Sequence, residues 1–451
     1  MRLHLATVSE ILSDFVANAD YKSIPKHIVS FAKLCIIDLI GVTLAGASYP
    51  ISKILKAYVE EKGGFPHATA IGLWMKSSSE NAALVNGTFA HYLDYDDVVV
   101  PMKGAGGAHV SAAVLPAALA IGEQNGLSGR DLIAAYAVGC EVTYGVGRGV
   151  DPSHFTKGWH TTCTEGVFGA TAAAGKLLQL NREELTYSFG LSGSQSAGLR
   201  ENFGTMTKPL HAGLAAENGV KSAMLAKLGF TSSKTIFEGQ FGFCNVASEK
   251  ANPTEITSKL GKWESVSNIR LKLYPCCALT YTAIDAARSI IRDHGLKPHD
   301  LEAITVTANP MVRGIVPFDN PITPLEAKFS MPFCVAVALT DGAVTLQHFT
   351  QEKLEFKELA ELVKRVKFVF DAKVPDFGAI VEVRSRQGKT HSQALNQPKG
   401  TAENPLSENE IIEKFKTCAR LVLSKDQVER LLTQLMKLEE LDDVGALLSF
   451  E

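Results

Sequence analysis

The sequence predicts a mainly helical protein, in which a large all-α domain is formed by both ends of the chain and a smaller α+β lid domain by its middle. Helical patterns follow one another through the first 250 residues, and β-branched and alternating segments appear only between about 265 and 400. Two further helical patterns end the chain. We therefore expect the all-helical domain to span 1–265 and 400–451, and the lid domain to span 266–399.

The helical patterns of the first part are unusually rich in alanine and glycine, as in the run AAVLPAALAIGE. Small side chains let helices approach closely, so this composition predicts tightly packed, nearly buried helices. The predicted helices are Ile24–Ala45, Ala112–Glu123, Gly129–Gly145, Thr162–Leu178 and Ala212–Leu228.

The middle of the chain mixes strand and helix patterns. Ile269–Leu273, Ala303–Thr307 and Ile380–Ser385 are predicted strands, and the residues 386–389 resemble a turn between two strands. Helical patterns lie between them at Thr282–His294 and Pro332–Leu339. Near the C-terminus, Ser407 with Glu410 and Ser424 with Gln427 have the spacing of capping boxes that open two helices.

Composition narrows the function classes. The chain has 451 residues, of which 46% are hydrophobic and 21% charged, and this composition excludes a disordered chain. The formal net charge of -3 gives no electrostatic field to hold nucleic acid or an anionic membrane. The first residues lack the pattern of a signal peptide, and the apolar stretch Leu34–Leu44 contains Asp38 and is too short to span a bilayer. Eight cysteines without a Cys-x-x-Cys pair predict a cytoplasmic protein with reduced thiols and no Cys-based metal site.

Two stretches of the first part could carry chemistry. In His91–Asp97, three carboxylates in four residues repel one another unless cations or backbone donors compensate, and a glycine-rich loop, Lys103–His109, follows. Asp94 could orient a catalytic partner while the loop delivers His109 to a pocket; the alternative is a solvated acidic turn and a flexible loop. His160, beside Trp159, could offer a ring N–H to an anion, although a lone histidine is more often structural.

Two later stretches are further candidates. Lys208 and His211 precede the predicted helix at Ala212, where a lysine could neutralise a substrate carboxylate or, if desolvated, transfer a proton; the alternative is a surface lysine in a loop. The segment Tyr274–Tyr281 lies at the junction between the helical part of the sequence and the part that mixes strands and helices. Pockets are common at domain interfaces. By itself the segment could equally be a strand–helix corner.

Taken together, these stretches resemble the MmgE/PrpD family, which includes 2-methylcitrate dehydratase, cis-aconitate decarboxylase and iminodisuccinate epimerase. The resemblance covers nearly the whole chain and rests on five blocks in consistent order: LDYDD with a downstream His-x-Ser, GWHTT with GVFGATAAAGKLL, TKPLHAGLAAENGV, LYPCCALT with AIDAA, and FSMPFCVAVALTDG. It implies a helical domain with an α+β lid, a homodimer, and a pocket that handles a polycarboxylate without metal or organic cofactor.

The resemblance also implies site residues. Asp94, His109, His160 and Lys208 match positions that line the family's pocket, where lysine and histidine balance substrate carboxylates. Two positions depart from the pattern: Val98 stands where many members have Thr, and Tyr281 where they have His. Arg148 and Arg200 are further candidates for binding a carboxylate.

Because an epimerase needs only two facing acid–base groups, the two departures favour epimerisation over dehydration or decarboxylation. We therefore expect a cofactor-independent epimerase of an amino-linked dicarboxylate such as iminodisuccinate. Lys208 and Tyr281, with Tyr144 in reserve, would remove and return the α-proton on opposite faces. The alternatives are a 2-methylcitrate dehydratase-like hydro-lyase, a cis-aconitate decarboxylase-like lyase, and a non-catalytic carboxylate-binding protein.

Overall fold

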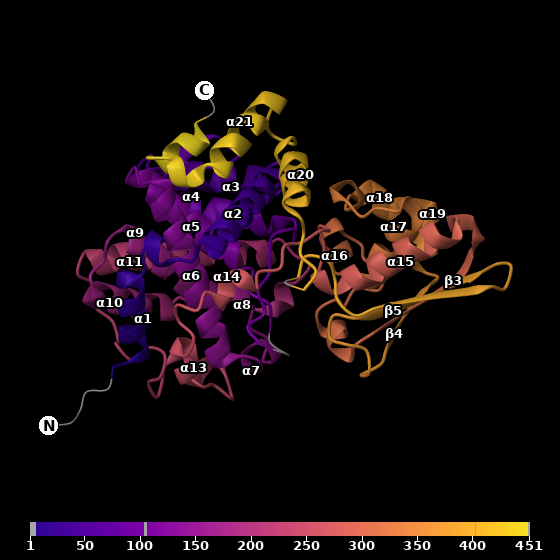
Figure 1. Cartoon of the computed structure of the whole chain (residues 1–451), viewed down its shortest axis with the longest axis horizontal. Coiled ribbons are helices and arrows are strands. Elements are labelled where there is room, and N and C mark those ends of the chain that lie inside the picture. The colour runs from indigo at the N-terminus through magenta and orange to yellow at the C-terminus, as the bar shows by residue number, and fades with distance from the viewer. Residues whose placement is uncertain (1–5, 103–105, 402, 450–451) are drawn as a thin grey trace.

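Helices from both ends of the chain surround the first of two hydrophobic cores in the computed structural model, which describes residues 6–102, 106–401 and 403–449. This core takes its buried side chains from Val8 to Leu271 and again from Leu406 to Leu448. The second core uses side chains between Tyr274 and Val383. Figure 1 shows the two units side by side, with the C-terminal helices lying on the N-terminal part of the larger one.

The larger unit contains the α-helices α1 (Val8–Asn18), α2 (Lys26–Ala47), α3 (Ile51–Lys62), α4 (Ser79–Tyr92), α5 (Val110–Gln124), α6 (Gly129–Val150), α7 (Ser153–Thr156), α8 (Thr161–Thr164), α9 (Gly166–Leu177), α10 (Arg182–Gly193), α11 (Thr207–Lys227), α12 (Phe243–Ala247), α13 (Thr254–Thr257), α14 (Glu264–Ser267), α20 (Glu408–Ala419) and α21 (Lys425–Met436). Small residues bring these helices together. A Cβ on Gly46 of α2 would lie 2.1 Å from the carbonyl oxygen of Phe89 in α4, and one on Gly213 of α11 would lie 2.2 Å from Thr88 Oγ1. Glycine is therefore required where α4 meets α2 and α11.

Helix α2 corrects one argument made from the sequence. With 22 residues it is long and apolar enough to cross a membrane, so the expectation that its apolar stretch is too short was wrong. However, 78% of its most apolar window is buried inside the fold, which is the environment of a core helix. Its one buried acid, Asp38, is paired with Lys414 of α20 at 2.8 Å.

The prediction of an all-α large domain with an α+β lid was wrong, because two strands lie within the part expected to be entirely helical. β1 (Ala68–Ala70) and β2 (Met75–Ser77) form an antiparallel sheet. At three residues each, they are too short to produce a periodic pattern in the sequence. The predicted strand Ile269–Leu273 is also absent: within this described segment only an isolated bridge joins Arg270 to Val98.

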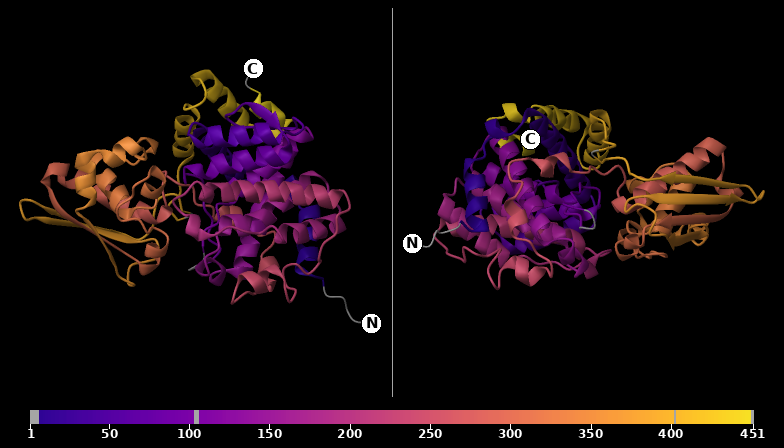
Figure 2. Two further views of the ribbon diagram at one scale, coloured as in Figure 1. Left: turned by 180° about the vertical axis from the view of Figure 1, so that it is seen from behind. Right: turned by 60° about the horizontal axis from the view of Figure 1, so that its bottom comes forward.

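The smaller unit contains a four-stranded sheet in the order β4-β3-β5-β6. β3 is parallel to β4 and antiparallel to β5, which pairs antiparallel with β6. α15 and α17 pack on this sheet (Figure 2). The elements are β3 (Leu301–Ala308), β4 (Val366–Phe370), β5 (Ala379–Ser385), β6 (Thr390–Leu395), α15 (Tyr281–His294), α16 (Pro324–Ala327), α17 (Met331–Asp341), α18 (Gln351–Glu355) and α19 (Lys357–Val363).

Candidate active site

A cavity lies where the two units meet, and both contribute to its wall. Its lining residues are Asp94, Val98, Val100, Gly107, His109, Phe155, His160, Phe203, Lys208 and Lys272 from the larger unit and its connecting segment, and Cys277, Ala278, Leu279, Met311, Ile315, Phe329 and Phe377 from the smaller unit. The charged side chains come from segments far apart in the sequence. Tertiary folding therefore assembles this site.

Asp94 is held between two buried lysines. Its Oδ1 accepts a hydrogen bond from Lys208 Nζ at 2.6 Å, and its Oδ2 accepts one from Lys272 Nζ at 2.7 Å. Lys272 Nζ also donates to the Asp94 carbonyl oxygen at 2.8 Å. Burial would raise the pKa of Asp94, but the two ammonium groups outweigh it and hold that pKa well below its usual range. Asp94 therefore stays ionised at all ordinary pH values.

The local backbone explains how one carboxylate reaches both lysines. Asp94 follows α4 with a φ of 51°, in the left-handed region that aspartate tolerates better than most residues. Lys208 stands in the first turn of α11, where a cation is disfavoured by the helix dipole. The Asp94 carboxylate offsets that cost. This position therefore serves the site and not the stability of the helix.

His91 extends this arrangement inward. Its Nε2 lies 2.9 Å from Lys208 Nζ, and its Nδ1 lies 2.9 Å from an oxygen of Asp96. Because an ammonium has no acceptor, Nε2 must accept and Nδ1–H must donate to Asp96. Burial lowers the pKa of His91 to about 3, so the ring is neutral in the resting protein. The result is a continuous chain of hydrogen bonds from Asp96 through His91 and Lys208 to Asp94 and Lys272.

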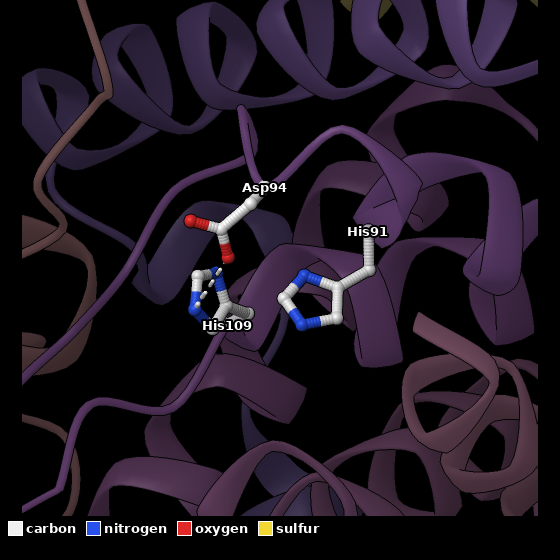
Figure 3. Close-up of side chains that lie close together, drawn as sticks. All are labelled: His91, Asp94 and His109. Carbon is white, nitrogen blue, oxygen red and sulfur yellow. Dashed lines mark ion pairs between the residues drawn. The ribbon is translucent and has the colours of Figure 1, made fainter. Parts of the chain in front are cut away.

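Two further histidines face the cavity. His109, the residue before α5, places Nε2 4.0 Å from Asp94 Oδ1 (Figure 3). Its Nδ1 lies 3.1 Å from Asp96 Oδ2. His160, the residue before α8, forms a hydrogen bond with His211, and the two Nδ1 atoms lie 3.0 Å apart. Burial lowers the pKa of both His109 and His160, for His160 with help from Lys208, so both rings are neutral near pH 7.

The third carboxylate of the acidic stretch, Asp97, faces away from this cluster. It accepts hydrogen bonds from the hydroxyl and the backbone N–H of Ser111. Burial raises the pKa of Asp97 to about 7. The three acids thus avoid repulsion in different ways: Asp94 pairs with lysines, Asp96 with histidines, and Asp97 holds its proton more tightly.

The structure does not bring either candidate tyrosine into this cluster. Tyr281 is 2% exposed, and its hydroxyl donates to the carbonyl oxygens of Tyr274 and Cys276. Burial raises the pKa of Tyr281 well above its usual value, which opposes a role as a base. Tyr144, on α6, lines a second cavity with Asn268 and not the cavity that contains Lys208.

The two candidate arginines are engaged with protein groups. Arg148 on α6 pairs with Glu255 and donates to Ser258 Oγ at 3.1 Å. Arg200 donates to the carbonyl oxygen of Phe155 at 3.0 Å and to that of Gly314 at 2.7 Å. Arg200 therefore ties the two units together beside the cavity, since Phe155 belongs to the larger unit and Gly314 to the smaller.

Packing explains the glycines at 106 and 107 of the glycine-rich loop. Lys103, Gly104 and Ala105 lie outside the described residues. A Cβ on Gly107 would lie 2.4 Å from Val98 Cγ2, and one on Gly106 would lie 2.3 Å from the Phe155 ring. Val98, which lacks the hydroxyl of a threonine, lines the cavity. Glycine at 106 and 107 therefore leaves room for Phe155 and Val98, which both line the cavity.

His91, Asp94 and His109 place ligand atoms within 4.8 Å of one another, close enough to hold a metal ion (Figure 3). However, Lys208 Nζ already donates hydrogen bonds to His91 Nε2 and Asp94 Oδ1, and Lys272 Nζ donates one to Asp94 Oδ2. A metal ion would have to displace an ammonium from a buried carboxylate. The donor set fits two lysines better than a divalent cation.

Lys272 was not among the site residues predicted from the sequence, and His91 was named only as the first residue of the acidic stretch. Lys272 is a single lysine between Leu271 and Leu273 in a segment interpreted as a strand, and it directly precedes the LYPCC block. A lone cation in an apolar run was the available signal, because such a residue needs a buried partner.

Comparisons with known proteins agree with this architecture. The model of the MmgE/PrpD N-terminal domain matches residues 10–256, and that of the MmgE/PrpD C-terminal domain matches residues 274–440. The chain belongs to the MmgE/PrpD family. Similar relatives include cis-aconitate decarboxylase of Homo sapiens, 26% identical over 98% of this chain and 94% of the relative, and that of Aspergillus terreus, 27% identical over 98% and 95%. The cis-aconitate decarboxylase-like protein oryM of Aspergillus oryzae is 26% identical over 98% and 96%.

Membership of this family makes the chain an enzyme. These relatives are decarboxylases or resemble them, so they support the lyase alternative better than the epimerase expected from the sequence. The epimerase expectation relied on a tyrosine facing Lys208. The positions of Tyr281 and Tyr144 give it no support.

Proposed function

We propose that this MmgE/PrpD enzyme is a lyase that decarboxylates cis-aconitate or a close analogue of it. The observation that carries the proposal is the donor count of the two lysines. Each ammonium has three N–H donors, and Lys208 and Lys272 each use two within the protein. The third donor of each has no acceptor among the described residues, and both side chains line the cavity. Two adjacent substrate carboxylates would complete both ammonium groups.

The same arrangement supports the chemical step. Loss of carbon dioxide from the saturated carbon of cis-aconitate leaves an electron pair that spreads through the double bond onto a remaining carboxylate. Cations aimed at that carboxylate stabilise the developing charge more strongly in a buried cavity than in water. The carbanion then takes a proton, and the dicarboxylate product leaves with one negative charge fewer than the substrate.

We assign the proton delivery to Lys208. Its side chain lines the cavity, and its Nζ also begins the chain of hydrogen bonds that runs through His91 to Asp96. After giving its proton to the carbanion, Lys208 recovers one from solvent when the product leaves. Phe203 and Phe329, whose ring centroids lie 5.4 and 5.0 Å from Nζ, exclude water from this ammonium during the step.

Proton NMR in deuterated water tests the proposed reaction. With cis-aconitate, we expect carbon dioxide release and a product that carries one deuterium from solvent per turnover. Release of water from methylcitrate, without carbon dioxide, would instead identify a hydro-lyase. Exchange of the α-proton of iminodisuccinate with no carbon dioxide from cis-aconitate would overturn the proposal in favour of an epimerase. Carboxylate binding without any turnover would identify a binding protein.

A further inference from the structure

The wall of the candidate active site divides into a cationic part and an apolar part. Lys208, Lys272 and Asp94 form the first. The second includes Val98, Val100, Leu279, Met311, Ile315 and Phe377. A fully ionised tricarboxylate has polar groups on every side, and carboxylates held against apolar side chains lose hydration without compensation. The apolar part therefore suits a section of the substrate that carries no charge.

This apolar part leads away from the lysines. Val100, Met311 and Phe377 line the second cavity as well as the first, whereas Lys208, Lys272 and Asp94 line only the first. The three shared side chains therefore stand between the cationic cluster and the second cavity. Arg270, whose guanidinium lies 4.4 Å from the centroid of the Phe377 ring, marks the point where the second cavity becomes polar.

We propose that the substrate carries an alkyl substituent of several carbons, an inference that rests on the proposed function. Its carboxylates bind Lys208 and Lys272, and its substituent lies along Val98, Val100, Met311 and Phe377 toward the second cavity. Val98 fits this reading: its methyl groups lie with those of Val100 over Gly107, where a hydroxyl would break the apolar surface. The chemical step is unchanged: the saturated carbon loses carbon dioxide and the carbanion gains a proton.

A substrate series tests the inference on the wild-type enzyme. The probes are cis-aconitate and its analogues with methyl, propyl and hexyl groups on the saturated carbon, compared by kcat/KM. Each methylene that becomes buried should raise kcat/KM roughly fourfold, so the propyl compound should exceed cis-aconitate by at least about tenfold. Turnover of cis-aconitate with no gain for the propyl compound would overturn this inference and leave the decarboxylase proposal standing. Turnover of none of the four would overturn both.

A matched pair of variants locates the substituent. Met311→Gln places an amide in the shared apolar section and should lower the propyl-to-unsubstituted ratio of kcat/KM by at least about fivefold, because a polar group there binds an alkyl chain poorly. Met206→Gln makes the same change at a side chain that is 42% exposed, and it should keep the wild-type ratio. Equal ratios in the two variants would contradict the proposed path of the alkyl group.

Discussion

Replacing Lys272 by methionine tests the most informative contact of the site. Lys272 is 2% exposed, and its Nζ donates to Asp94 Oδ2 at 2.7 Å and to the Asp94 carbonyl oxygen at 2.8 Å. Methionine keeps most of the apolar stem of the side chain but removes the terminal ammonium with its charge and all three donors. Asp94 retains its other ion pair, with Lys208 at 2.6 Å, so the carboxylate is not left without a cation.

These contacts set the expected magnitudes. Two hydrogen bonds to a charged group contribute about 1.5–3 kcal/mol each, and relief from burying an ammonium offsets part of that sum. We expect Lys272→Met to lower the free energy of unfolding by about 2–4 kcal/mol. The variant also loses a donor aimed at a substrate carboxylate, which typically costs a factor of about 10² to 10³ in rate.

Lys414→Met provides the matched control. Lys414 is also buried, pairs with Asp38 at 2.8 Å and donates to a main-chain carbonyl, that of Tyr95, at 2.8 Å, but it does not line the cavity. Both variants should lose stability in urea denaturation, and only Lys272→Met should lose decarboxylation by at least about hundredfold. A kcat/KM for Lys272→Met within threefold of wild type, with the fold intact, would refute the role of this lysine.

Three further predictions follow from the same geometry. Lys208→Ala should reduce kcat by at least about hundredfold with a normal circular dichroism spectrum, because it removes the proposed proton donor; a near-wild-type kcat would exclude Lys208 from the mechanism. Tyr281→Phe should keep kcat/KM within about threefold and lower the free energy of unfolding by about 1–2 kcal/mol, since its hydroxyl donates to main-chain carbonyls; a hundredfold loss of activity would restore it as a catalytic candidate. Asp97, whose pKa burial raises to about 7, binds a proton more tightly when folded, so its contribution to stability is complete below about pH 4 and falls as pH rises to about 7. In urea titrations, the free energy of unfolding of Asp97→Asn should therefore exceed that of wild type by about 2–4 kcal/mol at pH 8 and equal it at pH 4. Equal differences at both pH values would contradict this linkage.

Local patterns predicted the elements that depend on neighbouring residues. The boxes Ser407–Glu410 and Ser424–Gln427 do cap α20 and α21, with side chains and backbone N–H groups three residues apart bonded reciprocally. The turn at 386–389 likewise joins β5 to β6. Such features need only a few residues of chain, so their hydrogen bonds are already specified by the sequence within one turn.

Features that depend on partners far along the chain could not be predicted in this way. The strands β1 and β2 are too short to show a period, and the extended segment at Lys272 has the pattern of a strand but forms no ladder. The direction of the Tyr281 hydroxyl depends on where the carbonyl of Tyr274 lies once α15 has packed. Residue type alone left that hydroxyl as a plausible catalytic group.

The sequence by itself determined the family, the helical character of most of the chain, and Asp94, His109, His160 and Lys208 as lining residues of one cavity. Only the tertiary structure decided which groups share a proton or a charge. Lys272 and Asp94 are 178 residues apart, and they meet because the backbone at Arg270 pairs with that at Val98 and buries both side chains together. A buried charge must find its partner in space, and that partner need not be near in sequence.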